Sequence, residues 1–214
     1  AGLPAALDGL QAVIDCSNVT SLSRRTETDF FVAGTTNLTR AAAAAGVVHH
    51  VLLSIVGVDA VPMGYCRAKL AQERVLIEQA GRLKLPHSIV RTTQFHEFAS
   101  QMLDRSLIGR WAPVPGMRIR PVDLADVSQR LIEVATGRAA GRVPDLGGPR
   151  EEDLAELVRR LVAHRGERVR VVRVPLPGRV GHSIRAGGLL PEGGLTGRRD
   201  FAEWLEDQPV ENRD

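Results

Sequence analysis

The 214-residue sequence predicts an α/β protein in which a parallel sheet is followed by a smaller mixed lobe. Short apolar segments alternate three times with longer stretches of helical pattern, which is the order of strand–helix–strand units. Because such units cross over with one hand, their strands form a parallel sheet. Beyond residue 107 the pattern changes to short strands punctuated by proline and glycine. We therefore expect a sheet-forming part at 1–107 and a smaller lobe, interleaved with the sheet, at 108–214.

The first elements follow from local composition. Residues 1–10 match the end of a helix that runs into a turn at Asp8-Gly9. The segment QAVIDCS (11–17) is an apolar run followed by polar residues, which predicts a buried parallel strand. A helix is predicted from Thr26 to Ala45, since Gly46 suits the position after a helix end. Residues 47–55 are rich in β-branched side chains and predict the second strand.

The next elements repeat this alternation. An amphipathic pattern over 65–80 predicts a helix that stops at Gly81, followed by a strand at 85–93 and a helix at 95–107. In the tail the pattern predicts helices at about 123–137 and 151–164. Short strands are expected at MRIRPV, GRVPDLG and VRVVRVPLP.

Composition narrows the class of protein. Apolar residues make up 43% and charged residues 25%, as in ordinary globular proteins. No apolar run reaches the ~18–20 residues that a membrane span needs, and no signal peptide opens the sequence. We therefore expect a cytoplasmic protein without a membrane partner.

Charge and cysteine content exclude further classes. The pI is about 9.4, but the arginines are interleaved with acidic residues. Aromatic residues are only 4% of the chain, so stacking platforms for bases are scarce and we expect no nucleic-acid partner. Cys16 and Cys66 lie far apart in sequence and form no metal-binding spacing, so we expect them to be reduced and buried and expect no metal site.

The segment GYCRAK (64–69) contains the candidate catalytic pair. Tyr65 is the only tyrosine of the chain, and Lys69 is one of two lysines. Four residues apart on a helix, they share one face. A neighbouring ammonium favours the phenolate, which predicts a pKa for Tyr65 below the usual ~10. The alternative is a half-buried tyrosine beside an exposed lysine on an ordinary amphipathic helix.

Such a tyrosine can give a proton to a carbonyl oxygen while hydride reaches the carbon. Ser54 closes the preceding strand, and ligands of open α/β sheets bind at the carboxyl ends of the strands. A hydroxyl at that place is suited to orient the same carbonyl group.

Seven segments follow one another in a characteristic order: QAVIDCSN, GTTNLTRAAAAAGV (34–47), VLLSIVGV, GYCRAKLAQE, IVRTTQFHEF, RPVDLADV (120–127) and PDLGGP (144–149). This ordered series resembles the short-chain dehydrogenase/reductase superfamily, in its extended or atypical NmrA-like branch of NAD(P)-binding proteins. The resemblance covers most of the chain to about residue 165, with a weaker match at FAEWL (201–205). It implies a Rossmann-like, doubly wound parallel sheet and NAD or NADP as the cofactor.

The resemblance also implies roles for single residues. Tyr65 would be the general acid/base, Lys69 its electrostatic partner and a ribose ligand, and Ser54 the substrate-orienting hydroxyl. Further residues would lie beside the cofactor: Cys16, Ser17, Thr92, Thr93 and Gln94, the last three facing the nicotinamide end. Phe95 and His96 would line the substrate pocket, although a lone histidine is more often structural.

The sequence departs from the family pattern at two places. Phe31 stands where many relatives carry an asparagine that relays protons. No glycine-rich turn of the type GxGxxG or GxxGxxG, which binds the pyrophosphate, occurs in the chain. In the family that turn precedes the counterpart of Ala1, so we expect a partial sheet that lacks the N-terminal strands, a fragment of the full enzyme, and an open apolar edge at AVIDC.

These observations predict an NAD(P)-dependent oxidoreductase that acts on a small carbonyl or alcohol substrate. Two alternatives stay open, namely a non-catalytic NmrA-like protein that senses the dinucleotide and signals to a partner, and an inactive truncated remnant. The helices at 26–45 and 65–80 are candidates for a homodimer interface.

Overall fold

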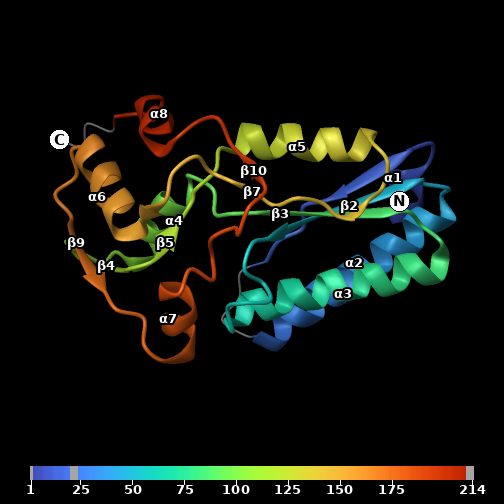
Figure 1. Cartoon of the computed structure of the whole chain (residues 1–214), viewed down its shortest axis with the longest axis horizontal. Helices are drawn as coiled ribbons and strands as arrows, with labels where there is room; N and C mark the ends of the chain where they lie inside the picture. Colours follow the sequence, from blue (N-terminus) through green and yellow to red (C-terminus); the bar gives the residue numbers. More distant parts are fainter. Residues whose placement is uncertain (1, 20–23, 211–214) are drawn as a thin grey trace. The chain divides into compact units, whose positions relative to one another are not determined.

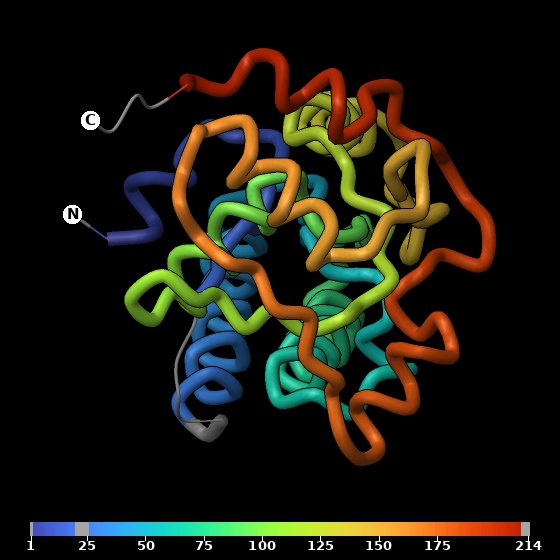
Figure 2. The backbone as a smooth tube through the Cα atoms, turned by 90° about the vertical axis from the view of Figure 1, so that its left-hand side faces the viewer, coloured from blue at the N-terminus to red at the C-terminus, as the bar shows by residue number. Residues whose placement is uncertain are grey.

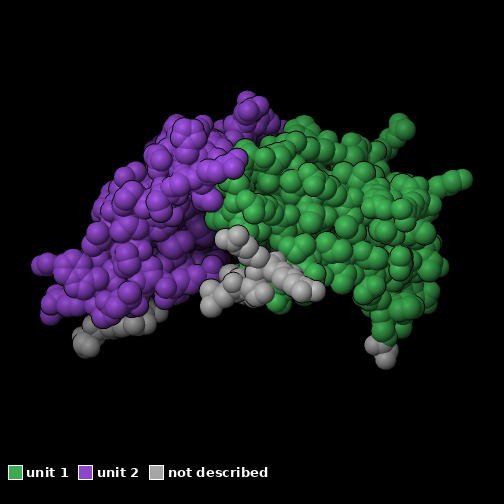
Figure 3. Space-filling view, turned by 90° about the horizontal axis from the view of Figure 1, so that it is seen from below, with its two compact units in different colours: residues 1–92, 128–145 green, residues 93–127, 146–214 purple. Residues whose placement is uncertain are grey.

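The computed structural model describes residues 2–19 and 24–210. The chain divides into two compact units, coloured separately in Figure 3. The first unit contains residues 1–92 and 128–145, and the second contains 93–127 and 146–214. The predicted α/β class with parallel strands is confirmed. The assignment of a cofactor-binding part and a substrate-binding part stays a prediction.

The first unit is built on parallel strands in sequence order. β1 (Ala12–Asp15) pairs with β2 (His49–Ile55), and β2 pairs with β3 (His87–Thr92). The short β6 (Gly141–Arg142) adds to β3 in the same direction. β2 is buried along most of its length, as expected for a strand covered on both faces. All three predicted strands are confirmed, with narrower bounds.

Helices cover both faces of these strands. α2 (Arg24–Ala44) and α3 (Gly64–Leu83) lie side by side on one face, and α5 (Leu124–Thr136) lies on the other (Figure 1). Figure 2 shows α2 in blue and α3 in teal from a second side, again next to one another. α1 (Leu3–Leu7) contributes Leu7 to an apolar cluster. The other members of that cluster are Ala42, Val47, Leu52, Leu76, Ala80, Leu85 and Ile89.

α3 is longer than the sequence predicts. It continues through Gly81 and ends at Leu83, so the predicted stop at Gly81 is wrong. The helix ends where Lys84 adopts a left-handed conformation, with φ of 54°, and its N–H bonds the carbonyls of Ala80 and Gly81. Leu85 is 5% exposed and enters the core directly afterwards. A glycine inside a helix lowers the helix stability by only about 1 kcal/mol. Burial of Leu85 after the helix end outweighs this loss.

A buried ion pair fixes α3 to β3. The Arg91 guanidinium donates from Nε to Glu73 Oε1 at 2.8 Å and from Nη2 to Glu73 Oε2 at 2.6 Å. Its remaining Nη1 reaches Asp59 Oδ2 at 2.9 Å, in the loop that precedes α3. The two carboxylates raise the pKa of Arg91. Bidentate pairs of this kind fix orientation as well as distance, so α3 has a defined position on the sheet.

The second unit contains short strands and helices, and its bounds differ from the predicted lobe at 108–214, since it includes 93–107 and leaves out 128–145. Two of its strand pairs are parallel: β4 (Trp111–Pro115) with β9 (Arg170–Val174), and β7 (Leu146–Gly147) with β10 (Leu195–Thr196). A third pair, β5 (Arg118–Ile119) with β8 (Glu152–Asp153), is antiparallel. Its helices are α4 (Phe98–Ser106), α6 (Leu154–His164), α7 (Gly178–Arg185) and α8 (Phe201–Glu206). Sequence reasoning missed β4, β8, β10, α7 and α8, which are all at most eight residues long.

No helix in the described part of the chain has the length and apolar character needed to cross a membrane.

His50 makes the first unit sensitive to acid. Its ring is fully buried in β2, with Nδ1 at 3.3 Å from the Thr39 hydroxyl of α2. Burial lowers the pKa of His50 to about 4, whereas a histidine of the unfolded chain titrates near ~6.5. Between these two values the unfolded state binds a proton that the folded state does not. The free energy of unfolding therefore falls as the pH is lowered through this range.

We expect His50 to contribute up to about 3 kcal/mol to this loss between pH ~6.5 and ~4. Urea unfolding at a series of pH values measures the slope. His50→Asn keeps a polar atom near Nδ1 but does not titrate, so its stability should be lower at neutral pH and should depend less on pH. His182→Asn changes an exposed histidine of α7 and serves as the control. An unchanged slope in the His50 variant would contradict this assignment.

Candidate active site

The candidate site lies at the carboxyl ends of β1 and β2, against α3, and all of its residues belong to the first unit. Asp15 ends β1, and Cys16, Ser17 and Asn18 follow it. Ser54 is the next-to-last residue of β2. Tyr65 lies in the first turn of α3, and Lys69 lies one turn later. This edge of the sheet is where ligands of open α/β folds bind.

Tyr65 and Lys69 share a helix face but do not have the same surroundings. The Tyr65 hydroxyl donates to Asn18 Oδ1 at 3.0 Å, in a half-buried position. Lys69 is only 3% exposed and donates from Nζ to the Leu53 carbonyl at 2.8 Å. The alternative of an exposed lysine is therefore wrong. Lys69 is directed at the end of β2, under the site.

Phe31 of α2 packs against both members of the pair. The Lys69 Nζ lies 4.9 Å from the centroid of the Phe31 ring, within range of a cation–π interaction. The Tyr65 ring meets the same phenyl ring edge to face, with centroids 6.1 Å apart. Phe31 is fully buried. A hydrocarbon ring thus occupies the place where the resemblance leads us to expect an asparagine.

The pKa of Tyr65 differs from the sequence prediction. Burial, followed by the charges of Cys66 and Glu27, raises the pKa of Tyr65 to about 12. The predicted lowering is therefore wrong, because Tyr65 is largely removed from water, and the Lys69 ammonium is bonded to the backbone of β2. At neutral pH Tyr65 is a phenol that can donate a proton.

Lys69 shifts in the opposite direction. Burial lowers the pKa of Lys69 to about 8, and the negative charges of Asp15, Glu73 and Cys16 oppose this effect. At neutral pH the side chain is therefore mainly an ammonium ion. A charge buried to this degree is tolerated only with good hydrogen-bond partners.

Gln72 supplies one of these partners and was not predicted from the sequence. Its Oε1 accepts from Lys69 Nζ at 2.6 Å. Its Nε2 lies 3.3 Å from Asp15 Oδ2 and 3.0 Å from Thr35 Oγ1. The sequence contained a usable signal, since a glutamine three residues after a lysine lies on the same helix face.

Asp15 is the second buried charge of the site. Its carboxylate is 3% exposed and accepts from the Ser17 backbone N–H at 2.9 Å and from the Thr35 hydroxyl at 3.2 Å. The predicted cofactor residue Ser17 thus turns back onto β1 through its backbone. Cys16, between them, is exposed, so its predicted burial is wrong, whereas Cys66 is buried as expected.

Two of the predicted hydroxyls are fully buried without a hydrogen-bond partner in the described part of the chain. Neither Ser54 Oγ nor Thr92 Oγ1 has a hydrogen-bond partner among the described residues. Ser54 lies opposite Arg91 in the register of β2 and β3, and Thr92 lies opposite Ile55. Side chains alternate along a strand. Ser54 therefore shares the face of Arg91, which is the α3 face, and Thr92 lies on the other face of the sheet.

The other predicted residues belong to the second unit. The Thr93 hydroxyl donates to the Arg120 carbonyl, and its backbone N–H donates to the Leu146 carbonyl. Gln94 and Phe95 are half-buried, and Gln94 Oε1 has no partner in the described part of the chain. Their roles toward cofactor and substrate stay predictions.

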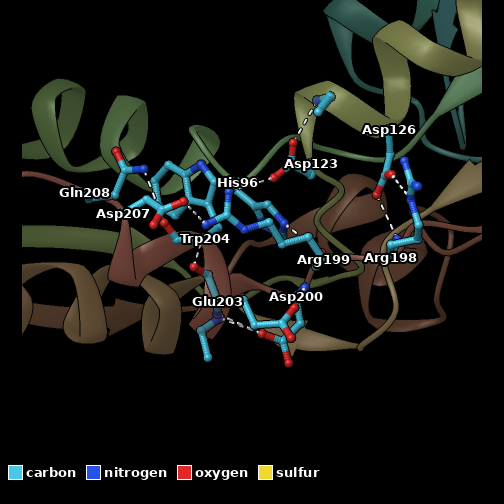
Figure 4. Close-up of polar contacts among 12 residues, drawn as sticks. His96, Asp123, Asp126, Arg198, Arg199, Asp200, Glu203, Trp204, Asp207 and Gln208 are labelled. Atoms are coloured by element: carbon cyan, nitrogen blue, oxygen red, sulfur yellow. Dashed lines mark hydrogen bonds and ion pairs between the residues drawn. The ribbon is translucent and has the colours of Figure 1, made fainter.

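His96 is part of a packed cluster rather than an open surface. It is 1% exposed, with ring centroids 5.8 Å from Phe201 and 5.7 Å from Trp204. Its Nε2 lies 3.2 Å from the Arg199 carbonyl, as Figure 4 shows. Burial lowers the pKa of His96, so the ring is neutral. Its predicted role in lining a substrate pocket stays untested.

The segment around Arg199 is held over His96 by ion pairs that sequence reasoning missed (Figure 4). Arg199 pairs with Asp123 at 3.6 Å and with Asp207, and Arg198 pairs with Asp126 at 3.0 Å. The signal was present as two adjacent arginines and the acidic residues of RPVDLADV. Opposite charges far apart in sequence do not identify their own partners.

Comparison with known proteins identifies the fold. No family model and no curated protein matches the chain. Among solved structures, MoeE5 in complex with UDP-glucuronic acid and NAD is 21% identical, with a TM-score of 0.71 over 97% of this chain and 81% of that chain. The NADPH-dependent quinone oxidoreductase QOR2 from Escherichia coli is 18% identical, with a TM-score of 0.68 over 95% and 78%.

A short-chain dehydrogenase/reductase superfamily protein from Agrobacterium tumefaciens, with bound NAD, is 19% identical, with a TM-score of 0.66 over 96% of this chain and 80% of that chain. The Rossmann-like fold that the resemblance to this superfamily implies is therefore confirmed.

The single tyrosine makes the pKa of Tyr65 directly measurable. Tyrosinate absorbance at 295 nm reports this one side chain, and we expect no ionisation of the folded protein until the pH approaches 12. Circular dichroism on the same samples shows whether the chain is still folded. Glu27→Gln removes a charge that raises this pKa and should lower it, whereas Asp29→Asn on the same helix is the control. Ionisation of the folded chain below pH ~10 would show instead that Lys69 stabilises the phenolate.

Proposed function

We propose that the protein is an NAD(P)-dependent oxidoreductase that acts on a small carbonyl or alcohol substrate. The observation that supports it most is the position of the Tyr65 phenol. It lies at the carboxyl end of the sheet, is protonated at neutral pH, and has Lys69 one helical turn below it. A tyrosine that transfers a proton in catalysis must be placed in this way, beside the reacting oxygen.

Ser54 supports the same assignment. Its hydroxyl lies on the α3 face of the sheet and has no hydrogen-bond partner among the described residues. A buried polar group without a partner is costly and calls for a reason. A substrate carbonyl that accepts from both Ser54 and Tyr65 would supply that reason, and the two donors would fix its orientation.

The residues fit one end of a dinucleotide. A bound nicotinamide ring would supply or accept the hydride, while Tyr65 gives or takes the proton at the substrate oxygen. Lys69 has three N–H groups, of which Leu53 and Gln72 accept two. We assign to Lys69 the role of placing a positive charge beneath the site. Binding of a ribose hydroxyl by its third N–H is a further predicted role. We assign no residue of this chain to the pyrophosphate, since the sequence has no glycine-rich turn of the dinucleotide type.

Solved structures of the same fold support a nicotinamide cofactor. The neighbours described above contain bound NAD in two cases, and the quinone oxidoreductase is named for its use of NADPH. Both cofactors therefore belong in the test, together with small aldehydes, ketones and quinones as substrates.

One observation favours a second function. Phe31 places a phenyl ring against Lys69 where a polar residue would connect the site to a proton source. Such a site would suit a sensor protein, which binds the dinucleotide without catalysing a reaction. Binding of cofactor with no turnover of any substrate in the panel would favour the sensor.

Tyr65→Phe tests the catalytic assignment. We expect NADPH or NADH to bind the variant as it binds the parent, by calorimetric titration, while turnover followed at 340 nm falls at least about 100-fold because the proton donor is gone. Turnover at the parental rate would rule out Tyr65 as the acid.

Ser54→Ala provides a sharper control, because it should lower activity without lowering stability. Removing an unpaired buried hydroxyl should leave the free energy of unfolding unchanged or raise it. Turnover should nevertheless fall, mainly through kcat. Parallel losses in stability and activity would instead indicate a purely structural serine.

A further inference from the structure

Gln72 lies between the two buried charges of the site. It is fully buried in α3, three residues after Lys69. One end of its amide meets the Lys69 ammonium at 2.6 Å, and the other end lies 3.3 Å from the Asp15 carboxylate. It therefore connects the end of β1 to the helix that contains Tyr65.

The chemistry of its neighbours fixes the orientation of the amide. An ammonium only donates hydrogen bonds, so the group that faces Lys69 must be the amide oxygen. The amide nitrogen then faces acceptors, and Asp15 Oδ2 and Thr35 Oγ1 both lie within hydrogen-bond distance of it. Glutamine meets both demands without adding a charge. A carboxylate at this position would repel Asp15, and an apolar side chain would leave both charges without this contact.

We propose that Gln72 is a positioning residue of this site: it holds the Lys69 ammonium against the end of β2 and links it to the Asp15 carboxylate at the end of β1. The proposal rests on the proposed oxidoreductase function for its catalytic meaning. The link itself rests only on the contacts of the first unit.

The other described groups around Lys69 do not accept a hydrogen bond from its ammonium group. Phe31 covers the ammonium from α2 but offers only a ring face. Negative charge reaches it from Asp15 at the end of β1 and from Glu73 on its own helix. Glu73 is engaged by Arg91 in a bidentate pair. The Leu53 carbonyl and Gln72 are thus the acceptors that touch Nζ within the described residues.

The chain offers a direct probe, because Lys69 is one of only two lysines. Protein grown with ¹³C-labelled lysine gives two sets of Cε signals in an NMR titration, and Lys84→Arg assigns them. In the parent we expect Lys69 to titrate near pH 8. Gln72→Met removes the acceptor of the ammonium and should lower this pKa by about one pH unit. Gln72→Glu places a carboxylate there and should raise it.

Opposite shifts in the two variants are the result that supports the proposal. Gln79→Met changes a half-buried glutamine of the same helix and should leave the Lys69 titration unchanged. A Lys69 pKa that is the same in parent, Gln72→Met and Gln72→Glu would overturn the proposal, whatever the stability of the variants. If Gln72→Met fails to fold, Gln72→Glu decides alone by the presence or absence of the upward shift.

Activity measurements distinguish a failure of this proposal from a failure of the proposed function. With turnover present, the pH at which kcat/KM changes should move in the same direction as the Lys69 titration in each variant. An unmoved pH profile in both variants would overturn the catalytic meaning of Gln72. Absence of turnover in the parent itself would overturn the proposed function, while the NMR titration would still decide whether Gln72 holds Lys69.

Discussion

The buried ammonium of Lys69 is the constraint on which the arrangement of the site depends. Removing a charge from water costs several kcal/mol unless hydrogen bonds and opposite charge replace the solvent. Here a strand-end carbonyl, a side-chain amide and a phenyl ring surround the ammonium. These three groups come from β2, α3 and α2. The elements must therefore meet at this point for the charge to be tolerated, and Tyr65 is placed by the same helix.

The Arg91–Glu73 pair extends this constraint along α3. Glu73 lies one turn beyond Lys69, and Arg91 lies on β3. The helix is thus held to the sheet through charged contacts at two successive turns, one to β2 and one to β3. A helix fixed only by its apolar face can rotate or slide by small amounts at modest cost, since hydrophobic packing is not directional. Directional contacts at two turns remove this freedom, and the phenol of Tyr65 gains a defined position.

The strands, the helices that alternate with them and the Tyr65–Lys69 pair were predictable because periodicity and spacing are local properties of the sequence. The direction of the Tyr65 pKa shift was not predictable, because it depends mainly on how far folding removes the phenol from water. The end of α3 was missed for a similar reason, since burial of Leu85 outweighs the local preference of Gly81. The role of Gln72 was not predictable either, because only folding brings Lys69 and Asp15 to the two ends of its side-chain amide. The ion pairs of Arg199 likewise join residues far apart in the sequence.

The two pKa shifts together bear on the direction of the proposed reaction. A phenol with a pKa of about 12 gives up its proton only when another group, the substrate oxygen, becomes more basic than the phenolate. That happens as hydride reaches a carbonyl carbon and an alkoxide develops, so reduction makes use of the protonated tyrosine. Oxidation of an alcohol needs the phenolate, which is scarce at neutral pH unless the Lys69 charge stabilises it. Because the Lys69 ammonium bonds Leu53 and Gln72 rather than the Tyr65 hydroxyl, the proposed reaction is expected to use Tyr65 as a proton donor at neutral pH, which is the role that carbonyl reduction requires.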